Sequence, residues 1–460
     1  MTHPRLVLFD LGRRIWLGAG YAYGWLPGSG AGEVTAGVRW EIPFQLRGAR
    51  ALARARALET FASFDGDQVD VTAVGLDFSR AYPSPLLRFT TFVGKRRRFD
   101  PPLFAGGWVE AVRVETVRTD AKQSFLKQET IFVEVRTDDG ATGLGYSYTI
   151  GTGGTAVLAM LNDYLLPQLV GLDAERVEAV WRQLYDATRA TAVGAITSLA
   201  LAAVDTALWD RRCLAAGLPL SVLAGGDHTE VPVYDTEVGW LHLPIDELVE
   251  GTAAAVAGGA KGVKIKIGKP SPAEDAERLA AVRAAIGPHR DLMVDANQAF
   301  TLAEALRRCD ALEAVGALWL EEPLPADDVA GHERLARHTS VAIAVGESVY
   351  STGQFAEYLA RGAAGIVQAD VARVGGITPW LKIAHMAEAN NVDMCPHFLM
   401  ELHVSLSAAV PNGRYVEYIP QLTAVTRSRL TVSGGMAQAP TVAGLGIDWD
   451  FAALENHRVA

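Results

Sequence analysis

The chain has few of the residues that mark secreted, membrane-bound or nucleic-acid-binding proteins. Its 460 residues include three cysteines, Cys213, Cys309 and Cys395, an odd and sparse set that supports neither a disulfide framework nor a zinc cluster. Acidic residues outnumber basic ones by 53 to 42, so we expect no nucleic-acid partner, since phosphate contacts need a basic surface. No apolar run is long enough to span a membrane, and Arg13 and Arg14 interrupt any signal-peptide pattern. These absences predict a cytoplasmic protein with no membrane partner.

The basic residues are concentrated near the start of the chain. Residues 1–100 hold 13 Arg, one Lys and 9 acidic residues, although the whole chain has a net charge of −11. This stretch has no clear helix or strand periodicity. We expect residues 1–108 to be an N-terminal extension: a small extra domain, a disordered tail, or upstream sequence that is translated in error. A basic arm for an anionic partner is a further alternative.

A regular pattern begins at residue 109. Two stretches alternate apolar and polar residues, as half-buried strands do, and a third follows after the turn at 137–140. Helical periodicity comes next. The order of strands followed by helices predicts a compact α+β unit over residues 109–229. The expected strands are 109–118, 129–136 and 142–148, and the expected helices are 155–166, 174–187 and 192–215.

A different rhythm runs from residue 230 to about residue 430. Eight short apolar runs are separated mostly by helical stretches, which is typical of a parallel β/α barrel. The runs are 231–236, 262–267, 292–296, 318–320, 341–345, 365–369, 392–395 and 415–419. Residues 431–460 are strand- and turn-like and must pack on a body that is already formed.

An ionisable residue stands at or near the end of each barrel run from the second to the eighth. From Lys266 onward, successive residues lie 20 to 29 positions apart, about one strand and one helix each time. We therefore expect all of them at the carboxyl ends of the strands, on the face where barrel enzymes carry their chemistry. They are Lys264, Lys266, Asp295, Glu321, Glu347, Asp370, His397 and Glu417.

Three of these residues form a candidate metal site. Asp295, Glu321 and Glu347 follow one another in two equal steps of 26 residues. Three carboxylates that converge on one barrel mouth repel one another unless a cation lies between them. Ligation by oxygen alone favours Mg²⁺ before Mn²⁺ or Ca²⁺. Glu322 is a rival to Glu321, because adjacent strand residues point to opposite sides.

The remaining residues suggest acid–base chemistry. Lys264 and Lys266 point the same way, and two adjacent ammonium groups should lower one pKa enough for a general base. Asp370 can fix the tautomer of His397 and raise its basicity, which gives a second acid or base opposite the lysines. Glu417, if protonated, can donate a hydrogen bond to a developing oxyanion. Together these groups suit removal of a weakly acidic proton beside a carboxylate.

Several short strings around these ionisable residues, taken in chain order, resemble the mandelate racemase subgroup of the enolase superfamily. The resemblance covers roughly residues 109–450 and implies an α/β fold, a modified TIM barrel of the (β/α)7β type. An α+β capping domain, to which residues 431–460 return, would cover it. The strings are Val263–Gly268, Val294–Gln298, Trp319–Pro323, Gly346–Ser348, Gln368–Asp370 with Val374–Gly376, and Pro396–His397.

The resemblance also implies roles for the residues. Lys266 would be the base with Lys264 beside it, Asp370 and His397 would form the opposing dyad, and Glu417 would lie near the substrate carboxylate. Asn297 would contact the site as well. Mg²⁺ would bind Asp295, Glu321 and Glu347, with Mn²⁺ as a possible substitute. The family is usually oligomeric, so a homo-oligomer between a dimer and an octamer is expected.

The fold and these groups predict proton abstraction but not the product. Hydroxyl-bearing residues at 146–152, with Ser124 and Lys127, favour a polyhydroxylated acid. We therefore predict a carbon–oxygen lyase that dehydrates an acid sugar, an aldonate or aldarate, to a 2-keto-3-deoxy acid. A racemase or epimerase and a cycloisomerase remain alternatives. A non-catalytic scaffold is disfavoured because Lys266 and His397 are both present.

Overall fold

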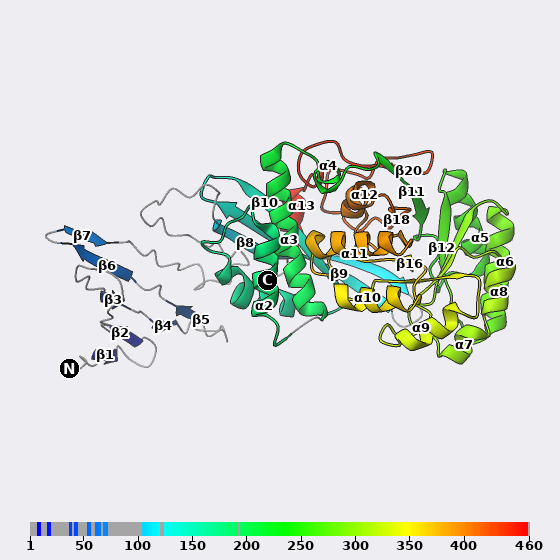
Figure 1. Cartoon of the computed structure of the whole chain (residues 1–460), viewed down its shortest axis with the longest axis horizontal. Coiled ribbons are helices and arrows are strands. Elements are labelled where there is room, and N and C mark those ends of the chain that lie inside the picture. Colours follow the sequence, from blue (N-terminus) through cyan, green and yellow to red (C-terminus); the bar gives the residue numbers. More distant parts are fainter. Residues whose placement is uncertain are drawn as a thin grey trace.

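The computed structural model describes residues 128–191 and 194–458 in full, and before residue 128 it gives strand bounds alone (Figure 1). The prediction for residues 1–108 and the residues Ser124 and Lys127 therefore lie outside the described residues. The early strands pair with one another: β1 with β2, β3 with β6 and β7, and β4 with β5. Their bounds are β1 Val7–Asp10, β2 Trp16–Ala19, β3 Ala36–Val38, β4 Glu41–Phe44, β5 Ala53–Arg56, β6 Thr60–Asp65 and β7 Gln68–Val71.

The capping unit is a three-stranded antiparallel sheet, in the order β10-β9-β8, packed against helices. All three predicted strands are present. The predicted helix at 155–166 is instead α1, one π-helical turn and a short 3₁₀ turn that contains Pro167, a residue that cannot donate a helical hydrogen bond. The bounds are β8 Phe104–Thr119, β9 Ser124–Thr137, β10 Thr142–Ile150, α1 Gly154–Met160, α2 Val177–Ala187, α3 Ala195–Ala216 and α4 Leu220–Ala224.

Two glycines on β10 let the long helix α3 lie directly on the sheet. A Cβ on Gly143 would stand 2.1 Å from the carbonyl oxygen of Ala207, and one on Gly145 would stand 2.2 Å from that of Ala203. Only a residue without a side chain fits such an approach. The alanine-rich face of α3 therefore packs on the backbone of the first half of β10.

The second unit is a closed barrel of eight parallel strands, and the predicted runs agree with it to within about two residues. β18 pairs with β11, and a bridge from Met394 to Gly413 joins β17 to the segment before β18. Helices connect the strands, so the barrel has the predicted (β/α)7β order. The strands are β11 Glu230–Asp235, β12 Gly262–Lys266, β13 Asp291–Asp295, β14 Trp319–Glu321, β15 Ala342–Val345, β16 Ile366–Val367, β17 Asp393–Met394 and β18 Val416–Tyr418.

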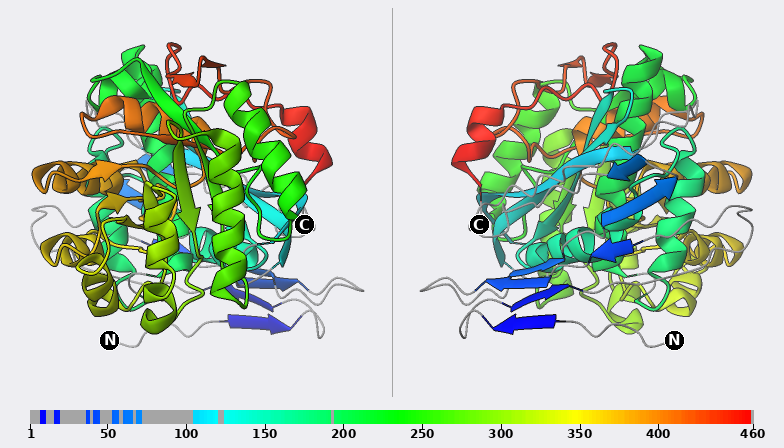
Figure 2. Two further views of the ribbon diagram at one scale, coloured as in Figure 1. Left: turned by 90° about the vertical axis from the view of Figure 1, so that its right-hand side faces the viewer. Right: turned by 90° about the vertical axis from the view of Figure 1, so that its left-hand side faces the viewer.

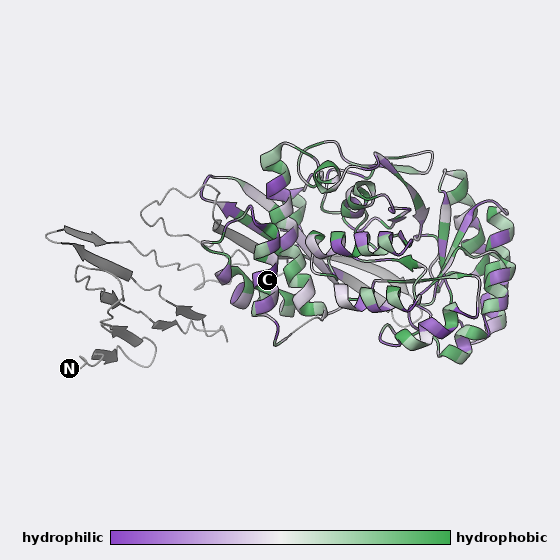
Figure 3. Cartoon of the chain, viewed as in Figure 1, coloured by the Kyte–Doolittle hydropathy of each residue, from purple (hydrophilic) through white to green (hydrophobic). Residues whose placement is uncertain are grey.

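The connecting helices surround the barrel and carry both apolar and polar residues (Figure 3). Local sequence sets their starts: Ser271 and Glu274 form a reciprocal capping box at the start of α6, with Pro272 in the first turn. Thr301 and Glu304 do the same for α7. The helices are α5 Ile245–Ala257, α6 Pro272–Ile286, α7 Leu302–Leu306, α8 Cys309–Ala314, α9 Val329–Ala336, α10 Thr352–Ala360, α11 Ile377–Ala389 and α12 Met400–Ala409.

The C-terminal segment contacts both the barrel sheet and the capping unit. Its strands β19 (Val432–Ser433) and β20 (Met436–Gln438) extend the barrel sheet, since β20 pairs antiparallel with β11. After these strands, the ring centroid of Trp449 lies 4.7 Å from that of Phe132 and 5.2 Å from that of Tyr146, both on cap strands. Helix α13 (Phe451–Asn456) then lies beside the cap sheet (Figure 2). Among the described helices, none has the length and apolar character needed to cross a membrane.

Candidate active site

The carboxyl ends of the barrel strands open into a cavity of about 340 Å³ beneath the cap. Among the sequence-predicted residues, Lys264, Lys266, Asn297, Glu347, His397 and Glu417 line it. Asp295, Glu321 and Asp370 are fully buried behind them. The cap contributes two further pieces of wall, from Tyr148 to Gly153 and from Ala195 to Leu199. The barrel thus supplies the charged floor of the cavity, and the cap supplies much of its roof.

The three predicted metal ligands come together in the fold. Asp295, Glu321 and Glu347 each offer one oxygen, and these atoms lie within 4.8 Å of one another. Parallel pairing of β13, β14 and β15 puts the strand ends in register, which explains the convergence. Three buried or half-buried carboxylate oxygens are a suitable donor set for Mg²⁺, so the residues present fit this ion.

The geometry distinguishes Glu321 from Glu322, since Glu321, and not Glu322, belongs to the group of converging carboxylates found among the described residues. Glu321 ends β14 and accepts hydrogen bonds from Trp319 Nε1 at 3.2 Å and Gln368 Nε2 at 2.7 Å. Glu322 has a φ of 38°, and its Oε2 accepts a hydrogen bond from Gln298 Nε2 at 3.3 Å. Burial and the neighbouring Glu347 raise the pKa of Glu322 well above its usual range.

The two lysines point into the site side by side, as the strand period requires. Lys266 Nζ lies 2.5 Å from Asp295 Oδ2, and Lys264 Nζ lies 3.0 Å from Glu321 Oε1. Burial and Lys264 lower the pKa of Lys266, but Asp295 and the other carboxylates raise it by more. The pKa of Lys266 is therefore raised overall. The predicted low pKa is not found while carboxylates are the only charges that balance this lysine.

Asp370 and His397 form the predicted pair. His397 Nδ1 lies 2.9 Å from Asp370 Oδ2, and His397 Nε2 lies 3.1 Å from Glu347 Oε2 and lines the cavity. Burial alone would lower the pKa of His397, but Glu347 and Asp370 raise it. His397 therefore tends to hold a proton, and it presents Nε2 to the cavity.

Glu417 differs from its predicted state. Its Oε1 lies 2.7 Å from Lys264 Nζ and also accepts the Thr236 hydroxyl at 2.7 Å, while Oε2 accepts the Phe398 N–H at 2.7 Å. Burial favours the neutral acid, but Lys264 and His397 lower the pKa of Glu417 far below its usual range. With these partners Glu417 favours the ionised form, whereas the sequence suggested a protonated donor. The sequence pattern was misleading because it does not show that Lys264, on β12, lies next to Glu417 on β18.

Some site residues have weak signals in the sequence. Thr236 follows β11 and lines the cavity. Its hydroxyl is not ionisable, so it does not stand out among the charged residues at the strand ends. Arg373 lies three residues after Asp370 and lines the cavity as well. Tyr148 was expected only as a specificity hydroxyl, yet it contacts Asp370. Conversely, Tyr146 does not line the cavity and packs on Trp449.

A capped (β/α)7β barrel with acid–base side chains around a carboxylate cluster defines a class of metal-assisted enzymes that act on carboxylic acids. The description "Mandelate racemase / muconate lactonizing enzyme, N-terminal domain" matches residues 109–225, and "Enolase C-terminal domain-like" matches residues 247–453. The chain belongs to the mandelate racemase/muconate lactonizing enzyme family of the enolase superfamily.

Similar proteins include dehydratases and a cycloisomerase. The L-talarate/galactarate dehydratase of Salmonella typhimurium is 34% identical over 330 residues, which cover 72% of this chain and 83% of that protein. The 3,6-anhydro-alpha-L-galactonate cycloisomerase of Streptomyces coelicolor is 35% identical over 355 residues, 75% of this chain and 98% of that protein. The crystal structure of L-talarate dehydratase from Polaromonas sp. JS666, complexed with Mg and L-glucarate, has a TM-score of 0.75 at 34% identity and covers 78% of this chain and 98% of that one.

Proposed function

We propose that this protein is a Mg²⁺-dependent dehydratase that converts an acid sugar, an aldonate or aldarate, to a 2-keto-3-deoxy acid. The observation that carries the proposal is that Lys266 and His397 line one cavity beside a cluster of three carboxylates. A base and an acid in one cavity are what the loss of an α-proton and a β-hydroxyl requires. Relatives named as L-talarate/galactarate and arabinonate dehydratases support the same reaction class.

In this proposal Asp295, Glu321 and Glu347 hold the metal ion, with Mn²⁺ as a possible substitute. Mg²⁺ bound there would offset the negative charge that develops on the substrate carboxylate. The site offers further polar contacts to a hydroxylated substrate. Asn297 lines the cavity, and its side-chain oxygen is buried without a hydrogen-bond partner among the described residues. The amide of Asn297 is therefore placed to bind a substrate hydroxyl.

Different residues carry out the two proton transfers of the elimination. The deprotonated form of Lys266, which is the minor form while the carboxylates are its only counter-charges, takes the α-proton on its Nζ. The electrons of the broken C–H bond move onto the substrate carboxylate as an enediolate. These electrons then form the carbon–carbon double bond as the C–O bond to the β-hydroxyl breaks, and His397 gives its Nε2 proton to the departing oxygen, which leaves as water. The resulting enol tautomerises to the keto acid. Lys264 remains paired with Glu321 and Glu417, which keeps the floor of the cavity ordered.

A cycloisomerase is the second candidate. The cycloisomerase from Streptomyces coelicolor aligns over 98% of its length. The cap side of the cavity also has apolar wall residues, Ile150, Ile196 and Leu199, which suit a compact ring better than a second charged group. Both reactions begin with removal of the same α-proton, so the catalytic residues do not distinguish them.

Proton NMR in D₂O separates these candidates. The full-length protein with Mg²⁺ is incubated with a panel of aldonic, aldaric and anhydro-aldonic acids, together with mandelate. A 2-keto-3-deoxy product is expected from one or two sugar acids. A product of unchanged composition with an opened ring would favour the cycloisomerase, and deuterium at an inverted α-carbon would favour a racemase or epimerase. No α-proton exchange with any acid across the panel would count against the proposed function.

We also propose that the protein is a cytoplasmic homo-oligomer, between a dimer and an octamer. Light scattering on the purified chain measures the assembly directly. A monomer at micromolar concentration would contradict this part of the proposal.

A further inference from the structure

Tyr148, at the end of cap strand β10, shares one carboxylate oxygen with His397. The Tyr148 hydroxyl donates to Asp370 Oδ2 at 2.5 Å, and His397 Nδ1 contacts the same oxygen at 2.9 Å. Tyr148 is 1% exposed and Asp370 is 0% exposed. A hydroxyl that donates to a buried carboxylate at this distance makes a charge-assisted hydrogen bond, which is among the stronger kinds.

The other oxygen of Asp370 is fixed by its own loop. Asp370 Oδ1 accepts the backbone N–H of Ala372 at 2.8 Å and that of Arg373 at 3.3 Å. These two hydrogen bonds fix the position of Asp370 Oδ1. The orientation of the whole carboxylate also depends on the partners of Oδ2, which are Tyr148 and His397. Burial raises the pKa of Tyr148 well above its usual range, so its hydroxyl keeps the proton that it donates.

A second link joins Tyr148 to the loop that carries Glu347. Arg373 Nε donates to the Tyr148 hydroxyl at 3.2 Å, and Arg373 Nη1 donates to the Glu347 carbonyl oxygen at 2.8 Å. One cap hydroxyl therefore contacts the carboxylate behind the candidate acid and, through Arg373, the loop of a candidate metal ligand.

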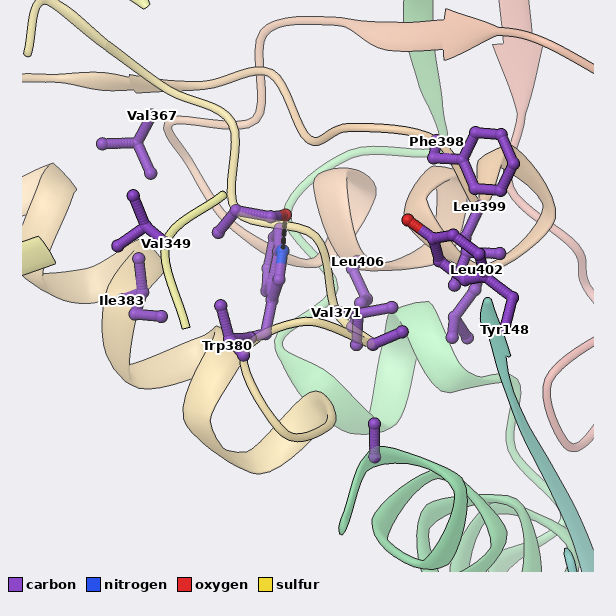
Figure 4. Close-up of a cluster of buried hydrophobic side chains, with 14 of the residues drawn as sticks. Tyr148, Val349, Val367, Val371, Trp380, Ile383, Phe398, Leu399, Leu402 and Leu406 are labelled. Carbon is purple, nitrogen blue, oxygen red and sulfur yellow. Dashed lines mark hydrogen bonds between the residues drawn. The ribbon is translucent and has the colours of Figure 1, made fainter. Parts of the chain in front are cut away.

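We infer that Tyr148 is a positioning residue that aligns His397 through Asp370, so that docking of the cap completes the acid–base apparatus of the barrel. This inference rests on the proposed function for its catalytic consequence. The ring of Tyr148 packs on Phe398, with centroids 4.6 Å apart, and lies among Leu399 and Leu402 (Figure 4). Tyr148→Phe keeps that packing and removes only the hydroxyl.

Tyr146→Phe is the matched control. Tyr146 lies two residues earlier on the same strand and is equally buried, but its hydroxyl has no hydrogen-bond partner among the described residues. With the acid that the wild-type protein converts, we expect Tyr148→Phe to lower kcat about 10- to 100-fold, the range for a hydrogen bond to a charged group. KM should change less than about twofold, because the hydroxyl is already bonded to Asp370 and Arg373. Tyr146→Phe should keep the wild-type kcat.

A double-mutant cycle with Asp370→Asn separates positioning from a general packing defect. If Tyr148 acts through Asp370, Tyr148→Phe should lower kcat less than about twofold further once Asp370 is Asn. A full second loss of about tenfold, or a wild-type kcat in the single variant, would overturn the inference.

A readout without turnover keeps this test separate from the proposed function. The downfield proton signal of His397 Nδ1, assigned by its absence in His397→Asn, should shift or broaden in Tyr148→Phe and stay in place in Tyr146→Phe. If the wild-type protein converts no acid, the proposed function fails and this signal still decides the positioning role. An unchanged signal in Tyr148→Phe would overturn that role.

Discussion

Lys264 Nζ lies 2.7 Å from Glu417 Oε1, and this ion pair joins β12 to β18 across the intervening strand β11. Both side chains are 1% exposed. The same ammonium lies 3.0 Å from Glu321, so one buried cation balances carboxylates on two sides of the barrel. Removal of one partner from such a group leaves the others charged, buried and without compensation.

Lys264→Met should therefore destabilise the fold. We expect the free energy of unfolding to fall by about 3–5 kcal/mol, the usual loss when one partner of a buried ion pair is removed. Denaturant unfolding followed by circular dichroism measures this. The control is Lys382→Met, whose ion pair with Glu178 is largely exposed and should contribute less than about 1 kcal/mol. Equal losses in the two variants would contradict the central role of Lys264.

Metal binding should distinguish the adjacent glutamates. Glu321→Gln and Glu347→Gln each remove one charged oxygen from the carboxylate group, so Mg²⁺ affinity should fall by at least roughly tenfold. Glu322→Gln is the matched control, because Glu322 is not one of the three converging carboxylates and accepts a hydrogen bond from Gln298. Isothermal titration with Mg²⁺ alone measures all three variants without substrate. A larger loss for Glu322→Gln than for Glu321→Gln would reverse the assignment.

The two candidate proton-transfer residues should each be required for turnover. Lys266→Ala and His397→Asn should lower kcat roughly 10²- to 10⁴-fold, the usual contribution of a positioned acid or base. His385→Asn is the control, since His385 forms a similar pair with Glu388 but is exposed on the surface. Rates of keto-acid formation measure the effect. Elimination at the full rate in His397→Asn would show that another group protonates the departing hydroxyl.

The contact between cap and barrel at Asp205 should make stability depend on pH. Asp205, on α3, accepts the backbone N–H and the hydroxyl of Thr378 at the start of barrel helix α11, at 2.8 and 2.7 Å. Burial raises the pKa of Asp205 to about 7, against about 3.9 in an unfolded chain. Between these values the folded state holds a proton that the unfolded state has lost. The contribution of Asp205 to the free energy of unfolding is therefore complete below pH 4 and disappears as the pH rises towards 7.

Asp205→Asn removes this dependence. The free energy of unfolding of the variant minus that of the wild type should rise between pH 5 and pH 7, by up to about 1.4 kcal/mol per pH unit. Chemical denaturation at several pH values gives the difference, in which the other titrating groups cancel. Asp186→Asn, at an exposed position, is the control variant in the same measurements. A flat difference for Asp205→Asn would show that Asp205 is already ionised in the folded protein.

Much of the fold could be predicted because its signals are local. Strand β12 alternates isoleucine and valine with Lys264 and Lys266, and this alternation shows both a strand and a common side for the lysines. Equal spacing along the chain places Asp295, Glu321 and Glu347 at one face, because each barrel unit uses a similar length of chain. The short β16 and β17 were also found, although the observed strands are only two residues long.

Other features could not be predicted, because they depend on contacts between distant segments. The convergence of Glu321, and not Glu322, with Asp295 and Glu347 accompanies a positive φ at Glu322, directly after β14. The ionised state of Glu417 follows from Lys264, which is more than 150 residues away in the chain. The contact of Tyr148 with Asp370 joins residues 222 positions apart, from two different units.

The sequence by itself determined the order of strands and helices and the residue types at the barrel mouth, because periodicity and chain length act locally. Only the tertiary structure decided how the charges pair and which groups keep their protons. Closure of the barrel brings β18 beside β11, and docking of the cap brings Tyr148 onto Asp370. Both events remove water from groups that are solvated in the open chain, and burial next to a specific partner then sets each charge state.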